Sequence, residues 1–173
     1  LLAEQLKKSF PSMRILFVGG HVAALPREVL EKHPYIDMVC QNEGVYTISN
    51  LLKTNLVDNL DKINGLGYRS NGHIVLNPPS PIVEKQDLPV EIPGIPWDKL
   101  PMQKYRTALW HAFPNRCERR PFAALYTSLG CPFRCSFRMI NIINRQENEY
   151  SDGSNIFRYW DPEFIIGEFD KLA

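Results

Sequence analysis

The first third of the chain alternates two patterns of apolar residues. Residues 1–10 and 45–54 carry apolar side chains at the spacing of an amphipathic helix, and residues 25–33 show a shorter pattern of the same kind. Between them lie continuous apolar runs at 14–18 and 36–40, which are typical of buried strands. Strands and helices that alternate with short connections predict a parallel sheet covered by helices.

The next part of the chain predicts a hairpin followed by irregular structure. Residues 67–70 and 73–76 flank Asn71-Gly72, a pair that tolerates the positive φ angles of a type I′ turn. Seven prolines then lie between residues 77 and 101, a density that excludes helix interiors and sheet centres. The pattern predicts an α/β domain at 1–76 and a proline-rich extended linker at 77–120.

The last part, residues 121–173, predicts a second strand–helix unit. Residues 122–127 are apolar, in part aromatic, and are typical of a buried strand that ends just before a pair of cysteines. Further on, Asp161-Pro162-Glu163 combines an N-cap residue, a proline for the first helical position and an acidic residue for the first turn. A helix is therefore predicted from residue 162 onward.

The composition is that of an ordinary globular protein, with 44% hydrophobic and 23% charged residues among 173. No apolar run approaches the roughly 20 residues of a membrane span, and no basic-then-apolar leader opens the sequence. These features predict a cytoplasmic protein without a membrane partner. The four cysteines are too few for a disulfide scaffold, and two of them, Cys131 and Cys135, are four residues apart.

The net charge of +1 conceals a basic block at residues 104–145, which holds eight Lys or Arg residues and Glu118 as its one acidic residue. Basic residues interleaved with aromatic ones can form a nucleic-acid surface. The aromatic residues in question are Tyr105, Trp110, Phe113, Phe122 and Tyr126. Several of them belong to the predicted buried strand, which argues against an RNA-binding surface.

The cysteine pair lies in the sequence Ser128-Leu-Gly-Cys131-Pro-Phe-Arg-Cys135-Ser-Phe137-Arg138, directly after the predicted strand. This stretch resembles the radical SAM signature C-x-x-x-C-x-aromatic-C. The resemblance implies that Cys131 and Cys135 ligate iron of a [4Fe-4S] cluster and that Phe137 packs near the adenine of S-adenosylmethionine. Thiolates are the usual ligands of such clusters.

The match fails at one position, because Arg138 stands where the family has its third cysteine. A guanidinium is permanently protonated and offers no lone pair to iron, and two thiolates alone would hold a cluster poorly. A natural change, a sequencing error and an engineered substitution all remain open. Cys40 or Cys117 could also supply a third ligand, although the spacing favours neither. Two other interpretations of the pair also remain: ordinary thiols of a packed loop, or a zinc site, which would need two more ligands at short spacing.

The earlier loops carry a second resemblance. Gly19-Gly20-His21, Asn42-Glu43-Gly44 and the hairpin are similar to the second half of the cobalamin-binding domains that precede the barrel in many radical SAM enzymes. The resemblance implies cobalamin contacts from Gly19, Gly20, His21, Glu43 and Gly44. Plain alternatives are a tight Gly-Gly turn and a loop-to-helix transition at Glu43.

Together the two resemblances imply an internal fragment of a cobalamin-binding-domain radical SAM enzyme. The implied fold is the C-terminal part of a flavodoxin-like (Rossmann-like) domain, followed by the first βα unit of a radical SAM partial TIM barrel. The implied partners are small molecules, namely S-adenosylmethionine and cobalamin beside the cluster, for radical generation with cobalamin-dependent methyl transfer. The alternatives are a non-catalytic cofactor-binding fragment and a degenerate homologue, and the substrate stays open.

Overall fold

The computed structural model describes residues 2–56, 58–107, 119–133, 139–143 and 157–172. The chain forms two compact units, one made of Leu1–Glu84 with Gly130–Arg158 and the other of Lys85–Leu129 with Tyr159–Ala173. The chain thus leaves the first unit after residue 84 and returns to it at residue 130. The sequence predicted consecutive segments at 1–76, 77–120 and 121–173, and their boundaries stay predictions.

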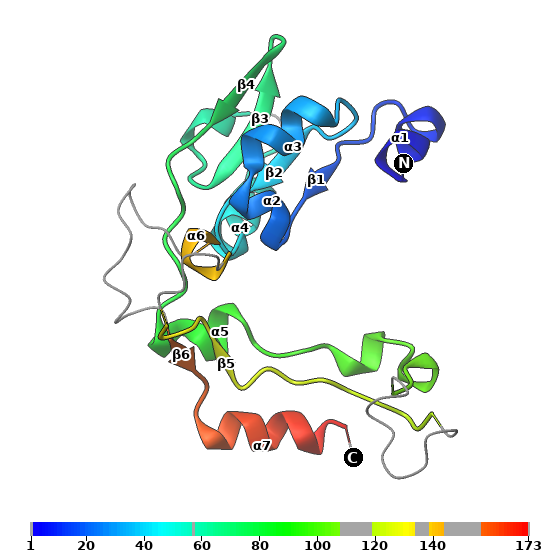
Figure 1. Cartoon of the computed structure of the whole chain (residues 1–173), viewed down its shortest axis with the longest axis vertical. Helices are drawn as coiled ribbons and strands as arrows, with labels where there is room; N and C mark the ends of the chain where they lie inside the picture. The colour runs from blue at the N-terminus through cyan, green and yellow to red at the C-terminus, as the bar shows by residue number, and fades with distance from the viewer. Residues whose placement is uncertain (1, 57, 108–118, 134–138, 144–156, 173) are drawn as a thin grey trace. The chain divides into compact units, whose positions relative to one another are not determined.

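The first unit is built on a sheet of mixed direction (Figure 1). Its strands, in the order in which they pair, are β1 (Leu16–Phe17), β2 (Met38–Cys40), β3 (Leu66–Ser70) and β4 (His73–Leu76). β1 and β2 are parallel, whereas β2–β3 and β3–β4 are antiparallel. The predicted parallel pair is confirmed, and the predicted hairpin extends the same sheet in the antiparallel direction.

Helices cover both faces of this sheet. They are α1 (Leu2–Ser9), α2 (Gly20–Ala24), α3 (Pro26–Lys32) and α4 (Val45–Lys53), with the short 3₁₀ turn η1 (Leu60–Lys62). On one face, Val22 of α2 and Leu30 of α3 pack with Val39 of β2. On the other face, Leu51 of α4 packs with Met38, the neighbour of Val39 in the strand. Successive residues of β2 therefore point to opposite cores, which is the two-residue period of a strand.

Three helices of the first unit and its hairpin turn agree with the predictions. The predicted helices at 1–10, 25–33 and 45–54 are present as α1, α3 and α4. Asn71 and Gly72 have φ angles of 48° and 79°, so the turn is of the predicted type with positive φ at both central residues.

The predicted burial of the 14–18 strand is confirmed only in part. Ile15 is buried, but Phe17 and Val18 are exposed by 36% and 47%. The reason is topological, because β1 is the edge strand of the described sheet and has β2 on one side only. An apolar run alone does not distinguish an edge strand from a central one.

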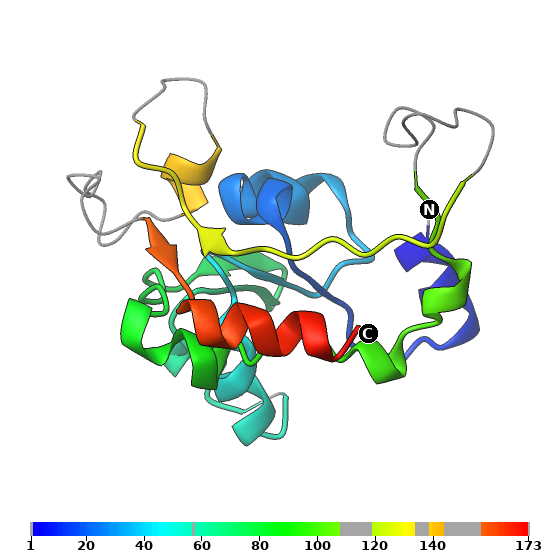
Figure 2. The same ribbon diagram turned by 90° about the horizontal axis from the view of Figure 1, so that it is seen from below.

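The second unit contains mostly short elements. In chain order they are η2 (Lys85–Asp87), α5 (Leu88–Glu91), η3 (Trp97–Lys99), η4 (Met102–Lys104), β5 (Ser128–Leu129), β6 (Arg158–Tyr159) and α7 (Pro162–Asp170). β5 pairs with β6, and α7 follows β6 along the chain (Figure 2). The helix predicted from residue 162 is confirmed as α7, with Pro162 in its first turn and the extended residue Asp161 before it.

The strand predicted at 122–127 is wrong. Strand geometry starts only at Ser128, and the side chains of Phe122 and Tyr126 are exposed by 39% and 74%. In the described part of this stretch, the pairing before β5 is a single antiparallel bridge between Arg106 and Pro121. The argument that burial disfavours a nucleic-acid surface therefore does not hold for Phe122 and Tyr126, and that hypothesis stays untested.

Among the residues that the structure describes, no helix combines the length and the apolar character that crossing a bilayer requires.

Gly65 and Gly72 have similar backbone conformations but differ in how closely other atoms approach them. Both have left-handed backbones, with φ angles of 76° and 79°. A Cβ atom at Gly65 would lie 2.8 Å from Cβ of Ser80, whereas one at Gly72 would meet nothing within 4 Å. We predict that Gly72→Ala costs about 1 kcal/mol of unfolding free energy through backbone strain. Gly65→Ala should cost roughly 1–3 kcal/mol more through overpacking.

Urea unfolding followed by circular dichroism measures both variants against the unchanged chain. Equal midpoints for Gly65→Ala and Gly72→Ala would contradict the packing at Gly65, since backbone strain is matched between the two positions.

Candidate functional site

The Gly19–His21 segment lies where β1 gives way to α2. The sequence predicted a loop here, but Gly20 already begins the helix, and the N–H of Ala23 donates to the carbonyl oxygen of Gly19 at 2.9 Å. A Cβ atom on Gly19 would meet nothing within 4 Å, so the space beside this residue is open. The side chain of His21 is exposed. Gly19 and His21 are therefore accessible to a ligand.

Gly20 is covered by the segment that follows the cysteine loop. The short helix α6 (Ile140–Ile143) packs against α2, and Met139 lies directly over Gly20. A Cβ atom on Gly20 would stand 3.1 Å from the sulfur of Met139, which is closer than most real contacts of that kind. The missing side chain at Gly20 thus admits Met139 in the described arrangement.

The loop after β2 turns sharply into α4. Asn42 and Gly44 have positive φ angles of 53° and 80°, and Gly44 is the N-cap residue of α4. A Cβ atom on Gly44 would lie 3.2 Å from Cβ of Cys40 and 3.3 Å from Cγ1 of Val18. Gly44 is therefore required by this turn. Asn42 is buried, and its side-chain Nδ2 donates to the carbonyl oxygen of Ile143 at 2.7 Å.

Both carboxylate oxygens of Glu43 are bound by groups of the protein. Oε2 accepts hydrogen bonds from the backbone N–H of Val83 and from Nη1 of Arg158, each at 3.0 Å. Oε1 forms an ion pair with Nη2 of Arg158. Arg158 also donates to the carbonyl oxygen of Val83, and its side chain is only 4% exposed. Glu43, Val83 and Arg158 form one buried network, which we call the Glu43 network.

Sequence analysis missed Arg158. The available signal was a cation inside the aromatic run Phe157-Arg-Tyr-Trp160, since a charged residue in an apolar stretch requires a partner if it becomes buried. Its partner, Glu43, is 115 residues away, a separation that sequence patterns do not bridge.

Of the predicted cluster loop, the structure describes the beginning. Gly130 has a positive φ of 85°, and the side chain of Cys131 is half-buried. Cys135, Phe137 and Arg138 lie outside the described residues, as does Cys117. Within the described ranges, no group of three His, Cys, Asp or Glu side chains is arranged to hold a metal ion.

Cys40 does not fit the role of a third iron ligand. It lies in β2 with no exposed surface, and burial raises the pKa of its thiol to about 11. Iron is bound by the thiolate, which this environment disfavours. Among the described residues, Cys131 is then the one cysteine left as a candidate iron ligand, and a guanidinium such as that of Arg138 cannot donate to iron.

The predicted cobalamin residues do not present one shared surface. Gly19 and His21 are open, but Gly20 lies under Met139, Gly44 is packed against Cys40, and the carboxylate of Glu43 is bound by Arg158. The residues therefore fit a corrin only at Gly19 and His21 in this arrangement.

The second unit contains a comparable buried carboxylate, Glu168 of α7. The Glu168 residue is 1% exposed and accepts hydrogen bonds from the N–H of Ile95 at 3.1 Å and from Nε1 of Trp97 at 3.2 Å. Lys171, the C-cap residue of α7, forms an ion pair with the other oxygen. A Cβ atom on Gly94 would stand 2.7 Å from Oε2 of Glu168, so this close approach depends on glycine. We call this arrangement the Glu168 network.

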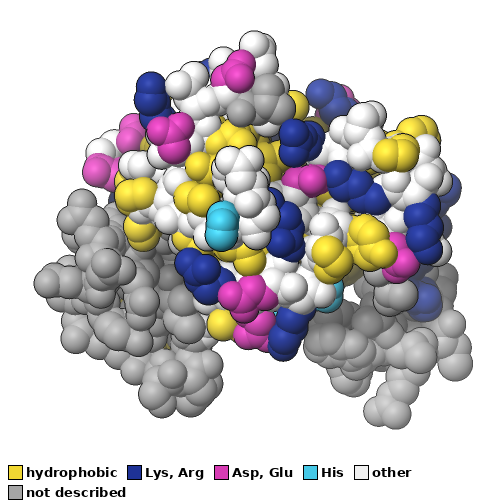
Figure 3. Space-filling view, turned by 90° about the horizontal axis from the view of Figure 1, so that it is seen from above, with side chains coloured by type: hydrophobic (Ala, Val, Ile, Leu, Met, Phe, Trp, Pro, Cys, Tyr) yellow, Lys and Arg dark blue, Asp and Glu magenta, His cyan; other side chains and the backbone are white. Residues whose placement is uncertain are grey.

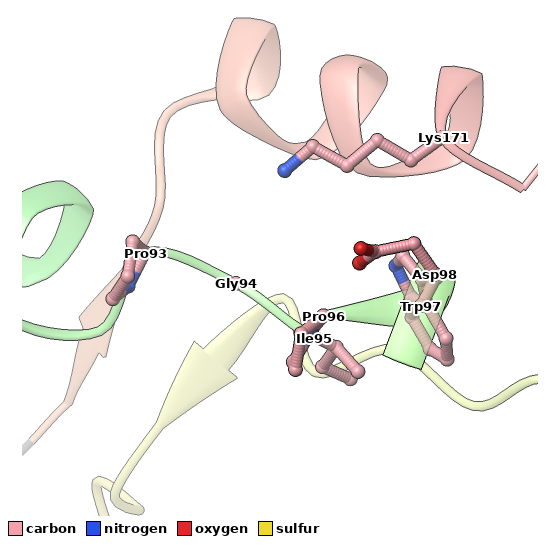
Figure 4. A pocket seen from close by; sticks show the side chains of 7 residues that line it. All are labelled: Pro93, Gly94, Ile95, Pro96, Trp97, Asp98 and Lys171. Carbon is pink, nitrogen blue, oxygen red and sulfur yellow. The ribbon is translucent and has the colours of Figure 1, made fainter. Parts of the chain in front are cut away.

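A pocket of about 520 Å³ lies beside the Glu168 network (Figure 4). It is lined by the 93–98 loop and by Lys171, which extends from α7 over that loop. In the space-filling view of Figure 3, basic, acidic and apolar side chains are interspersed over the visible face, and charge of one sign does not dominate it. Neither the pocket nor the face seen in Figure 3 indicates a ligand by itself.

The curated relatives of the chain include methyltransferases. An uncharacterised methyltransferase of Pyrococcus horikoshii is 35% identical over 142 residues, which are 79% of this chain and 27% of the relative. The cobalamin-dependent radical SAM methyltransferase TokK of Streptomyces tokunonensis is 28% identical over 141 residues, 79% of this chain and 19% of TokK. No family model matches the chain.

One solved structure supports the fold. The cobalamin-dependent S-adenosylmethionine radical enzyme OxsB, with aqua-cobalamin and S-adenosylmethionine bound, aligns with a TM-score of 0.55 over 99% of this chain at 19% identity. The aligned part is 20% of OxsB. The likeness shows a shared mixed α/β fold. The chain spans roughly a fifth to a quarter of the length of the relatives it matches.

The Glu168 network predicts a pH dependence in the second unit. Burial raises the pKa of Glu168, but the donors Lys171, Ile95 and Trp97 together outweigh burial and leave it below the ordinary value of 4.5. A carboxyl group with a lowered pKa stabilises the fold above its unfolded pKa. This stabilisation is lost as the pH falls through the folded value. The protection of the Ile95 amide against hydrogen exchange should therefore decrease on acidification.

Glu168→Gln should lower the protection of the Ile95 amide at pH 7 and make it less dependent on pH, because the charge-assisted hydrogen bonds are replaced by weaker neutral ones. Glu163→Gln, an exposed position in the first turn of the same helix, is the matched control. Protection factors corrected for intrinsic exchange provide the measurement. Equal pH dependence in Glu168→Gln and the unchanged chain would show that Glu168 is not responsible.

Proposed function

This chain is homologous to cobalamin-dependent radical SAM enzymes, and on that basis we propose that it carries the junction between their two cofactor regions. Residues 1–76 are proposed as the C-terminal part of a flavodoxin-like, Rossmann-like cobalamin-binding domain, and residues 121–173 as the first βα unit of a radical SAM partial TIM barrel. The mixed sheet with helices on both faces and the fold shared with OxsB support this proposal.

The observation that carries the proposal is the cysteine loop within a chain whose relatives include radical SAM methyltransferases. We propose that Cys131 and Cys135 ligate iron and that Phe137 flanks the adenine of S-adenosylmethionine. A complete [4Fe-4S] cluster would supply the electron that cleaves S-adenosylmethionine. Since Arg138 cannot donate to iron, the loop as written holds an incomplete site.

Cobalamin is proposed as a second cofactor of this class of protein, for transfer of a methyl group. In this chain Gly19 and His21 are the residues open to it, and the side chain of His21 offers a polar contact. A cytoplasmic location is proposed with these cofactors. The substrate-contacting residues of a barrel enzyme come from the ends of several strands, and residues 121–173 represent only the first βα unit in the proposal.

The second candidate is a cofactor-binding protein without catalysis, or a degenerate homologue of the enzymes. The specific observation in its favour is Arg138 at the position of the third ligand. The two candidates differ in one measurable property, which is the ability of the unchanged sequence to hold a complete cluster.

Replacing Arg138 tests the proposed cluster site. We predict that Arg138→Cys, in a chain extended through a whole barrel, binds about four irons after anaerobic reconstitution, because three thiolates then hold the cluster. The unchanged sequence should bind little or unstable iron. Iron counting gives the stoichiometry, and electron paramagnetic resonance of the reduced protein should show a signal that changes when S-adenosylmethionine is added.

Arg138→Ser is the matched control, since it removes the guanidinium without adding a thiolate. If neither the cysteine variant nor the unchanged protein binds iron, the pair is structural and the enzymatic proposal falls. If the serine variant and the unchanged protein bind as much as the cysteine variant, a residue other than 138 is the third ligand.

The cobalamin proposal predicts a dependence on chain length. A protein extended to the length of the relatives should show corrin absorbance after reconstitution, while the 173-residue chain should bind weakly, because a ligand crevice between strands needs loops from both halves of the sheet. Gly19→Trp, which fills the open space beside β1, should reduce binding in the longer protein more than Gly19→Ala, which shares the backbone strain at φ 126°. No corrin absorbance in the longer protein would remove the cobalamin proposal.

A further inference from the structure

The Glu43 network joins three parts of the chain that are far apart in sequence. Glu43 belongs to the loop after β2, Val83 follows the hairpin, and Arg158 stands at the end of the segment that carries the cysteines. The hydrogen bonds of Glu43 and Arg158 bridge 115 residues, and those of Arg158 and Val83 bridge 75. These contacts fix the end of the cysteine segment on the loop after β2.

The same loop also binds the cysteine segment at a second point. Asn42, the neighbour of Glu43, donates to the carbonyl oxygen of Ile143 in α6. Met139, at the start of α6, covers Gly20. The segment that returns to the first unit at residue 130 is therefore held by two consecutive residues, Asn42 and Glu43, at positions 143 and 158.

The ion pair of Glu43 and Arg158 is buried, and its geometry is fixed. The side chains of Glu43 and Arg158 are 14% and 4% exposed, and Nε of Arg158 has no hydrogen-bond partner among the described residues. Removing one partner of a buried pair leaves an uncompensated charge, which is much more costly than breaking an exposed pair. The bidentate contact between a planar guanidinium and a carboxylate also fixes the orientation of both groups.

We propose that Glu43 is a positioning residue for the cysteine loop, acting through Arg158, and not a contact of cobalamin. Arg158 begins β6, which pairs with β5, and β5 ends at Leu129, two residues before Cys131. The ion pair thereby orients the backbone at Cys131, the described start of the loop. The part of this inference that concerns iron rests on the proposed function. The part that concerns the position of Cys131 depends only on the Glu43 network and on the pairing of β6 with β5.

The test uses the alkylation of Cys131 in the folded 173-residue chain, followed by mass spectrometry of the labelled peptide under native conditions. Glu43→Gln removes the charge but keeps an acceptor for Val83, and Arg158→Met removes the donor. Each should raise the alkylation rate of Cys131 about tenfold, which corresponds to roughly 1.4 kcal/mol of local opening free energy. The double variant should resemble the single ones, because residues of one network are not additive.

The controls are present in the same molecule. Cys40 is buried in β2, so its alkylation reports opening of the whole unit and should stay slow in every variant. Glu28→Gln breaks the exposed Glu28–Lys32 pair of α3, whose side chains are 43% and 67% exposed, and should leave the rate of Cys131 unchanged. Arg158→Lys keeps the charge but loses the bidentate contact, and should give an intermediate rate.

Three outcomes overturn the inference. An unchanged rate at Cys131 in Glu43→Gln and Arg158→Met would show that the pair does not position the loop. Parallel acceleration at Cys40 and Cys131 in every variant, Arg158→Lys included, would show that the pair supports the unit as a whole. Full rescue by Arg158→Lys would show that charge alone suffices.

Failure of the proposed function gives a different result. If Arg138→Cys binds no iron, the proposed cluster is absent, and the alkylation of Cys131 still decides the positioning role. If Arg138→Cys does bind iron, adding Glu43→Gln should alter the paramagnetic signal of the reduced cluster while Glu28→Gln does not. An identical signal in Arg138→Cys with and without Glu43→Gln would contradict the part of the inference that concerns iron.

Discussion

The Glu43 network and the Glu168 network both depend on one constraint: the backbone N–H groups of the proline-rich stretch need hydrogen-bond acceptors. Seven prolines between residues 77 and 101 prevent this stretch from joining a sheet or a long helix, so its remaining N–H groups need other acceptors. Buried carboxylates supply them in both units. Glu43 accepts from the N–H of Val83, and Glu168 accepts from the N–H of Ile95.

Each carboxylate is also paired with a cation, which makes its burial tolerable. Arg158 pairs with Glu43 and Lys171 pairs with Glu168. An isolated buried carboxylate would become protonated instead, but for Glu168 the surrounding donors keep the pKa below its ordinary value. A buried carboxylate paired with a cation therefore occurs twice. Glu43 connects Val83 to the turn after β2, and Glu168 connects Ile95 to α7, each within its own unit.

The sequence predicted those features of the structure that depend only on neighbouring residues. The Asn71-Gly72 turn depends on the φ preferences of two residues, and the start of α7 has Pro162 and the acidic Glu163 in its first turn. Burial is different, because it depends on what lies beside a segment. The run at 14–18 is an edge strand, and residues 122–127 are not a strand, although both have the composition of a buried one. Sequence patterns likewise did not indicate the partner of Glu43.

The candidate site shows the same difference between local and distant features. The cysteine spacing and the glycines are local motifs, and sequence analysis was able to name them. What surrounds them is set by distant residues: Met139 covers Gly20, Ile143 binds Asn42, and Arg158 neutralises Glu43. The family motif that suggests Glu43 as a cofactor contact carries no information on residue 158, so it could not indicate the ion pair of Glu43.

The two described cysteines show how the fold separates structural thiols from candidate ligands. Cys40 is enclosed by the sheet, and the same enclosure raises the pKa of its thiol to about 11, so burial and chemistry agree that it is a packing residue. Cys131 is half-buried and follows a left-handed Gly130 at the end of β5. Asn42 and Glu43 bind Ile143 and Arg158, which lie on the C-terminal side of the cysteine loop. Changes at position 138 and at position 43 therefore address different contacts and can be tested independently.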